Sequence, residues 1–248
     1  MAWFLTEPLL LSAHSNHIRM KTSLLLGNQF NKYIYALFTI LGICLFSCKK
    51  DEVVTDKKVK GEAKIKIINA VPSAAVDFYL DNSKVNDQVI GYGVEPEYIK
   101  IHSGEVNASF SKGGITGAIA ELNFVPTLSY TSFYVEDKKA IGSIVTLEDN
   151  FGATASGMAR VRIVNLSPYF TNTVNVNTSN ELLLAALDFK DFSANFTFNP
   201  DVDLRFSIIG TGTVKTMKAS EFEAGKTYTV WIGGTSNSTL SFNKISYN

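Results

Sequence analysis

Two similar segments of alternating apolar and basic residues lie 96 positions apart, and they set the strongest constraint on the fold. Residues 63–72 read AKIKIINAVP and residues 159–168 read ARVRIVNLSP, and the two align without a gap. An apolar period of two is typical of a β-strand with one buried face and one wet face. Each segment therefore predicts a strand on which the basic residues, Lys66 and Arg162 among them, face water.

The likeness continues beyond these segments at an offset of 98 residues. Val76 then aligns with Val174, Phe124 with Phe222, and the Tyr-Thr pair at residues 130–131 with that at 228–229. Each copy is a little under 100 residues long, which is a usual size for one small domain. The repeat therefore predicts two domains of one kind.

Turn signals recur at short intervals within each copy, and short strands with such turns favour a sandwich. We expect an all-β chain with two tandem antiparallel β-sandwich (immunoglobulin-like) domains, at residues 62–148 and 157–248. Residues 148–157, EDNFGATASG, are the predicted linker. The main exception is ELLLAAL at residues 181–187, which is interpreted as a helical turn.

The N-terminal region has the composition of an export signal. Residues 33–47 hold no charge and follow Lys32, and a basic start before a short apolar run is typical of a secretory signal peptide. We expect a helical signal peptide over residues 1–47, with translation starting at Met20. The less favoured alternatives are an uncleaved signal anchor and a plain secreted protein. A membrane-spanning helix needs about 20 apolar residues, and this run is shorter.

The end of the apolar run resembles a bacterial lipobox. Leu45 and Ser47 occupy the positions that signal peptidase recognises, and Cys48 is the predicted site of lipid attachment. Cys44 is a poorer fit, because the branched Ile43 precedes it and apolar residues follow it. Several acyl chains on one cysteine hold a protein to a membrane stably.

Polar sequence begins directly after Cys48. Lys50, Asp51 and Glu52 resemble the surface-export tag of Bacteroidetes lipoproteins, and residues 48–61 are interpreted as a lipidated tether. We therefore expect an outer-membrane lipoprotein exposed at the cell surface, with the membrane as its partner through the lipid.

The repeated motifs are similar to those of a bacterial family, domain of unknown function 4397. The likeness consists of the first strand described above, V-D-F-Y at residues 76–79 and the aromatic-Thr pair at 130–131, and it covers residues 61–248. The second copy departs from it at Asn175 and Asn177, where the first copy has Asp and Tyr. The resemblance implies a β-sandwich, export and tandem copies, and it implies no reaction.

Motifs for catalysis are weak. His102 is the only histidine after Cys48, and we interpret it as a solvated turn residue rather than a catalytic base. Residues 109–112 match S-x-x-K but fall on a predicted strand without the partner motifs. Residues 225–227 resemble the end of a phosphate loop, yet Ser220 stands where a glycine is required. We predict no catalytic residues and no cofactor.

Neither a metal site nor nucleic-acid binding is predicted. Lys+Arg and Asp+Glu both total 23, and residues before Cys48 hold three of the bases and one of the acids, which leaves a net charge of −2. Nucleic-acid binders usually carry a basic excess. A calcium site is a less favoured hypothesis, since calcium needs several oxygen ligands. The loop residues that could supply some of them are Asp81, Asn82, Asp87, Asp201 and Asp203.

Asn69 and Asn165 recur with Pro72 and Pro168, and we interpret them as turn residues whose amides bond local backbone.

Exposed aromatic side chains are a further candidate, because they bind sugars and proteins. The four candidates are Tyr79, Tyr92, Tyr98 and Trp231, and the structural alternative for them is core or sheet-edge packing. The leading functional hypothesis is a non-catalytic binding module for a glycan or an envelope protein. A structural or spacer role is the alternative, and a hydrolase is the third.

Overall fold

The computed structural model describes residues 61–73, 75–95, 97–149 and 151–247. Within these ranges the chain forms sixteen β-strands and two short 3-10 helices, η1 (Ala219–Glu221) and η2 (Asn237–Thr239), without an α-helix. The described residues belong to one compact unit that begins at Asp56. The predicted all-β class is confirmed.

The predicted export signal, Cys48 and its flanking residues, and the tether up to residue 60 lie outside the described residues. Among the residues that the structure does describe, no helix has the length and apolar character needed to cross a bilayer.

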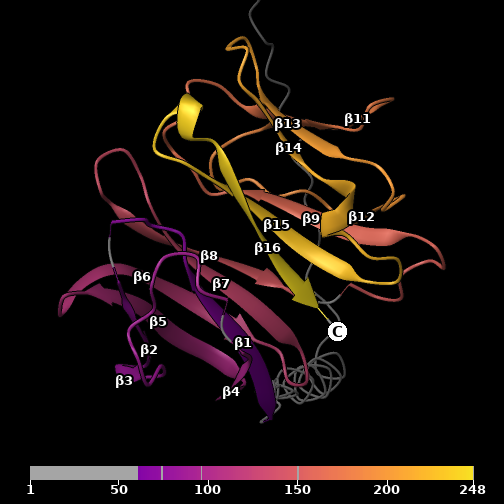
Figure 1. The fold of residues 1–248 in the computed structure, drawn as a ribbon. Helices are drawn as coiled ribbons and strands as arrows, with labels where there is room; N and C mark the ends of the chain where they lie inside the picture. Colours follow the sequence, from indigo (N-terminus) through magenta and orange to yellow (C-terminus); the bar gives the residue numbers. More distant parts are fainter. Residues whose placement is uncertain (1–60, 74, 96, 150, 248) are drawn as a thin grey trace, which may run out of the picture. The chain divides into compact units, whose positions relative to one another are not determined.

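The first eight strands form the first sandwich, drawn in indigo to magenta in Figure 1. Its two sheets have the strand orders β4-β1-β7-β8 and β3-β2-β5-β6, and are called here the β1 sheet and the β2 sheet. The strands are β1 (Glu62–Asn69), β2 (Asp77–Leu80), β3 (Ser83–Lys84), β4 (Ile99–His102), β5 (Gly104–Lys112), β6 (Ile115–Phe124), β7 (Ser129–Glu136) and β8 (Gly142–Glu148).

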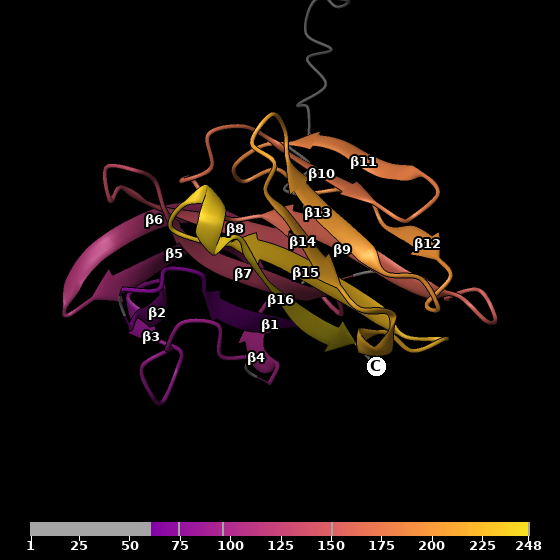
Figure 2. The ribbon, with the colours of Figure 1, turned by 45° about the horizontal axis from the view of Figure 1, so that its top comes forward.

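The remaining eight strands form the second sandwich, drawn in orange to yellow in Figures 1 and 2. The β9 sheet has the order β12-β9-β15-β16 and the β10 sheet has the order β11-β10-β13-β14, so each strand occupies the place of the strand eight before it. The strands are β9 (Ala159–Asn165), β10 (Val174–Asn177), β11 (Leu182–Leu187), β12 (Phe196–Phe198), β13 (Leu204–Ile208), β14 (Val214–Met217), β15 (Thr227–Gly233) and β16 (Ser241–Tyr247).

Each sandwich contains one parallel pair of strands. Strand β1 pairs with β7 and β9 pairs with β15, and these are the two parallel ladders among the described strands. Ile65 lies opposite Tyr130 in the first ladder, and Val161 lies opposite Tyr228 in the second. The expected sandwiches are therefore antiparallel except at this pair, because the first and seventh strands enter their sheet from the same end.

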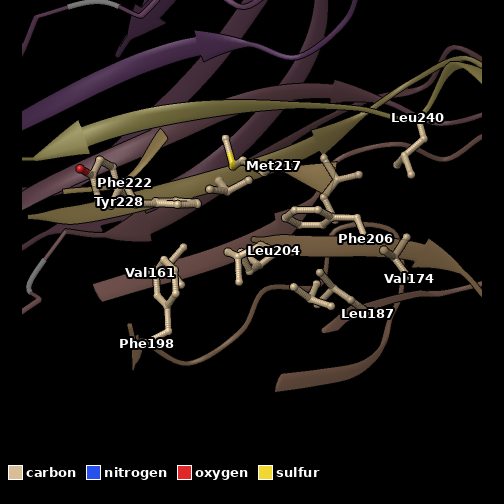
Figure 3. Close-up of a cluster of buried hydrophobic side chains, with 14 of the residues drawn as sticks. Val161, Val174, Leu187, Phe198, Leu204, Phe206, Met217, Phe222, Tyr228 and Leu240 are labelled. Carbon is tan, nitrogen blue, oxygen red and sulfur yellow. The ribbon is translucent and has the colours of Figure 1, made fainter. Parts of the chain in front are cut away.

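The interior of each sandwich is filled by the inward side chains of its two sheets. Phe78 and Phe110 pack at 4.7 Å between ring centroids in the first core. Val176 and Phe206 are opposite one another in the second core, which Figure 3 shows around Phe206 and Leu204. Burial of such side chains contributes about 1.5–3 kcal/mol each.

The recurrent asparagines play the same structural role in both sandwiches. Asn69 accepts a hydrogen bond from the Val71 amide at 2.9 Å and donates to the Ile90 carbonyl at 3.2 Å. Asn165 accepts from the Ser167 amide at 3.1 Å and donates to the Leu187 carbonyl at 3.2 Å. The interpretation of both as turn residues that bond backbone is confirmed.

The expected helical turn at residues 181–187 is wrong, because this segment forms strand β11. It pairs with β10 through two register shifts, so six residues of β11 face four of β10. Ala186 has a φ of 55°, and its amide donates to the Asn175 side chain at 2.8 Å. The run of leucine and alanine is helix-like in composition, but sheet pairing and this irregularity override that propensity.

Strands β6 and β8 approach closely where the two sheets of the first sandwich meet. A Cβ added to Gly142 would lie 2.2 Å from the carbonyl oxygen of Gly117 and 2.9 Å from the Tyr134 ring. No side chain fits at that distance. Glycine is therefore required at position 142 for this edge of the sandwich to close.

We predict that Gly142→Ala destabilises the protein by about 1–3 kcal/mol, because the added methyl group overpacks a closed contact. Urea unfolding of the full-length chain in detergent, followed by tryptophan fluorescence, measures the change. Gly91→Ala is the matched control, since its Cβ would meet nothing nearer than 3.4 Å. Equal unfolding midpoints for the two variants would contradict the required contact.

Candidate functional site

The outer face of the β10 sheet carries a hollow of about 420 Å³, which we call the β10 hollow. Its floor comes from β10 and β13, and its walls come from the β10–β11 turn and the start of β14. The residues that line it are Asn177, Thr178, Ser179, Asn180, Glu181, Leu182, Arg205, Ser207 and Val214. The volume lies within the usual range for a small-ligand site.

Strand alternation explains why these side chains face outward. Leu204, Phe206 and Ile208 of β13 are buried in the core, so Arg205 and Ser207 between them point to the other face. Arg205 lies opposite Asn177 across the β10–β13 ladder. The floor therefore presents an amide, a hydroxyl and a guanidinium next to one another.

The polar groups of the floor are unused within the protein. No hydrogen bond or ion pair to the side chains of Asn177, Arg205 or Glu181 occurs among the described residues. A ligand would not have to displace an internal contact to reach them. Leu182 and Val214, which are 53% and 47% exposed, add apolar surface to the walls.

The turn that forms one wall is held in place by its own hydrogen bonds. The hydroxyl oxygen of Thr178 accepts from the amides of Asn180 and Glu181 at 3.2 and 3.1 Å, and the Thr178 amide donates to the Glu181 carbonyl at 2.9 Å. Such side-chain bonds to nearby backbone fix a turn. The wall is therefore ordered before any ligand arrives, which lowers the entropic cost of binding.

The equivalent face of the first sandwich carries different side chains. The pair Phe78 and Phe110 in the first core corresponds to the pair Val176 and Phe206 in the second. One residue further along these strands, Tyr79 therefore corresponds to Asn177, and Ser109 corresponds to Arg205.

There Lys84 lies opposite Tyr79 and forms an ion pair with Asp77 at 2.9 Å, which holds the pKa of that carboxyl below its usual value. The two sandwiches therefore differ in chemistry at this face.

Another hollow, of about 450 Å³, lies among hydroxyl-rich loops of the second sandwich. Its side chains already bond one another: Asn237 donates to the Thr171 hydroxyl at 2.8 Å, and Thr239 accepts from the Thr235 amide at 2.8 Å. These contacts order the loops and leave few free groups. The β10 hollow is therefore the stronger candidate.

Three of the four aromatic candidates lie in a cluster between the sandwiches. Trp231 is 1% exposed, and Tyr92 packs edge-on against it at 5.7 Å. Tyr98 packs against the same cluster, which joins Ile68 and Phe133 of the first sandwich to Val164 of the second. Their role is packing, as the structural alternative predicted. Tyr79 is half-buried on β2.

The expectation that Lys66 and Arg162 face water is wrong. Lys66 is 6% exposed and Arg162 is 4% exposed, because the outward faces of β1 and β9 lie in the contact between the sandwiches. Arg162 forms an ion pair with Asp149 at 2.9 Å, with side chains 5% and 1% exposed. Lys66 pairs with Glu95 at 3.3 Å. Buried charges require such partners.

Hydroxyl groups complete the network around the buried carboxylate. Asp149 accepts from the hydroxyls of Tyr98 at 2.9 Å and Thr131 at 2.7 Å. The Tyr247 hydroxyl lies 3.1 Å from the Thr131 hydroxyl. Burial and the charge of Asp149 raise the pKa of Tyr247 to about 12. The same causes raise the pKa of Tyr98. Both phenols therefore stay protonated. Asp149 belongs to the predicted linker, residues 148–157, so that this segment is partly buried.

The remaining sequence candidates do not converge. His102 is exposed at the end of β4, and residues 109–112 form the end of β5. Asp81 accepts from the Asn107 amide at 2.9 Å, and Asp203 pairs with Lys218 at 2.9 Å. Among the described residues no group of three or more His, Cys, Asp or Glu side chains could hold a metal ion.

Sequence reasoning did not single out Arg205, and it noted Asn177 only as a departure from the family motif. A signal for Arg205 existed, since it alternates with buried residues of a strand. Pairing of β10 with β13 places Arg205 opposite Asn177. This pairing is known only once the fold is known, so the sequence pattern did not predict it.

Comparison with models of protein families identifies a related domain. A family model, Domain of unknown function (DUF4397), matches residues 63–173. The match supports the resemblance noted from the motifs, and it covers the first sandwich and β9. The family description gives no function. A comparison with curated proteins finds no match.

We predict that Arg162→Met destabilises the protein by about 3–5 kcal/mol, because it leaves the Asp149 carboxylate buried without its partner. Thermal unfolding of the full-length chain in detergent measures the effect. Adding Asp149→Asn in the same chain is expected to restore part of the loss. Arg160→Met is the control on the same strand, since Arg160 is only half-buried. A loss no larger than that of the control would contradict the assigned network.

Proposed function

We propose that the chain is a surface-exposed outer-membrane lipoprotein, anchored through Cys48, whose second sandwich is a non-catalytic binding module for a glycan. The β10 hollow carries this proposal. It is an ordered concavity whose amide, hydroxyl and guanidinium groups have no partner within the described residues. Sugars offer hydroxyl groups that both donate and accept, which matches such a floor.

A glycan fits this site better than a protein segment does. A peptide commonly adds a strand at the edge of a sheet, where free backbone groups give affinity. The β10 hollow instead lies over the two central strands of its sheet, β10 and β13. Its contacts are therefore made by side chains, and the apolar side chains of Leu182 and Val214 suit the C–H face of a sugar ring.

We also propose that the second sandwich is a further copy of the family domain found at residues 63–173. Three observations support this. The two sandwiches share one strand order. Asn165 repeats the bonds of Asn69. The Tyr228 hydroxyl accepts from the Glu223 amide at 2.9 Å, as the Tyr130 hydroxyl does from Val125 at 2.9 Å.

A structural or spacer role is the alternative function. The buried contact between the sandwiches favours it, because the Arg162–Asp149 pair resists bending between the two halves. The two functions differ in whether the β10 hollow has a ligand.

We expect full-length protein in detergent to bind one or more members of a glycan array. Asn177→Tyr should reduce that binding at least about tenfold, because it places in the hollow the ring that Tyr79 supplies on the first sandwich. Asn123→Tyr, at an exposed position on β6, is the matched control and should bind as the wild type does. Absence of all glycan binding would support the spacer role, and binding by Asn177→Tyr would exclude the hollow.

The anchor is tested separately. We expect Cys48→Ala to abolish incorporation of labelled palmitate and to leave the chain unanchored or held by its uncleaved signal, because no other residue is the predicted acceptor. Cell fractionation and labelling measure both effects, with Cys44→Ala as the control that keeps its label. A processed, lipid-labelled Cys48→Ala protein would show that the anchor is elsewhere.

A further inference from the structure

We infer that the β10 hollow selects acidic glycans and that Arg205 binds the carboxylate of a uronic-acid unit. This inference rests on the proposed glycan-binding function and names its ligand class. It starts from the position of Arg205 in the centre of the sheet face, opposite Asn177 on one side and Thr216 on the other.

Three cations of the second sandwich have an ion-pair partner, and Arg205 differs from them in having none. Arg162 pairs with Asp149, Lys218 with Asp203 at 2.9 Å, and Lys244 with Glu221 at 3.4 Å. Arg205 has no ion pair or side-chain hydrogen bond among the described residues, although it stands on a rigid central strand. Its five N–H donors are therefore free for a ligand.

Comparison with the first sandwich isolates this charge. The position equivalent to Arg205 is Ser109, and the ring of Tyr79 and the Lys84–Asp77 pair lie on the neighbouring strands. The second sandwich thus has an added cation where the first has a small neutral side chain. Neither residue contributes to a hydrophobic core, so core packing does not explain the difference.

The chemistry of guanidinium selects the ligand class. Its planar donors match a carboxylate with two parallel hydrogen bonds, which are charge-assisted and directional. Asn177 and Ser207 lie on neighbouring strands and can bond the hydroxyls of the same or the next sugar ring. Glu181 on the wall adds an acceptor for sugar hydroxyls. A saccharide with a carboxylate beside several hydroxyls uses all of these groups.

The test compares pairs of soluble ligands that differ in charge. Oligosaccharides containing uronic acids and their carboxyl-reduced forms are printed on one array and titrated against full-length protein in detergent. We expect the acidic member of at least one pair to bind at least about tenfold more tightly, as the loss of a charge-assisted contact predicts. Higher salt should narrow that difference.

Variants then assign the difference to Arg205. Arg205→Ser, which installs the residue of the first sandwich, should remove the preference for the acid, so that the acidic and reduced members of a pair bind with equal affinity. Lys138→Gln removes the same charge from an exposed turn of the first sandwich and should change nothing.

The outcomes separate the two proposals. Equal binding of both members of every pair, or binding of neutral glycans alone, would overturn the acidic preference while the glycan-binding function stands. Failure to bind any glycan would overturn both proposals. An acidic preference that persists in Arg205→Ser would overturn the assignment to this residue, and capture of poly-glutamate peptide in place of glycans would point to an acidic protein partner and overturn the inference.

Discussion

The contact that joins the two sandwiches is built around the ion pair between Arg162 and Asp149 and an apolar cluster beside it. The ion pair lies where the outward faces of β1 and β9 meet, and both side chains are almost fully buried. Phe151 packs over the guanidinium at 4.9 Å, so the connection between the sandwiches is part of the same contact. The interface leaves the outer β10 face, with its hollow, available to solvent.

The strand pattern of the chain was predictable because side-chain alternation depends on local geometry alone. Repetition of that pattern predicted two sandwiches of one kind, and the chain forms two sandwiches with equivalent strand orders. The wet face expected for Lys66 and Arg162 was wrong for a physical reason. A two-residue period assigns side chains to the two faces of a strand, but it does not predict what packs against the polar face. The partners of these two cations, Glu95 and the buried Asp149, come from other segments of the chain.

The candidate site was less predictable than the fold. Aromatic residues were candidates for binding, with packing as the alternative, and Trp231 and Tyr98 pack in the cluster between the sandwiches. The β10 hollow depends on which residues stand opposite one another across β10 and β13, and on the irregular pairing of β11. Only the exchange of Tyr79 for Asn177 was visible in the repeat.

The two sandwiches share one strand order but carry different side chains on their corresponding outer faces. Tyr79 and Lys84 lie on the face of the first sandwich that corresponds to the β10 hollow of the second. Under the proposed anchoring and glycan binding, this hollow gives each chain a single site of its kind, and binding strength toward a polymer would come from many molecules gathered in the plane of the bilayer. Surface density would set the avidity, and expression level would become the means of tuning it.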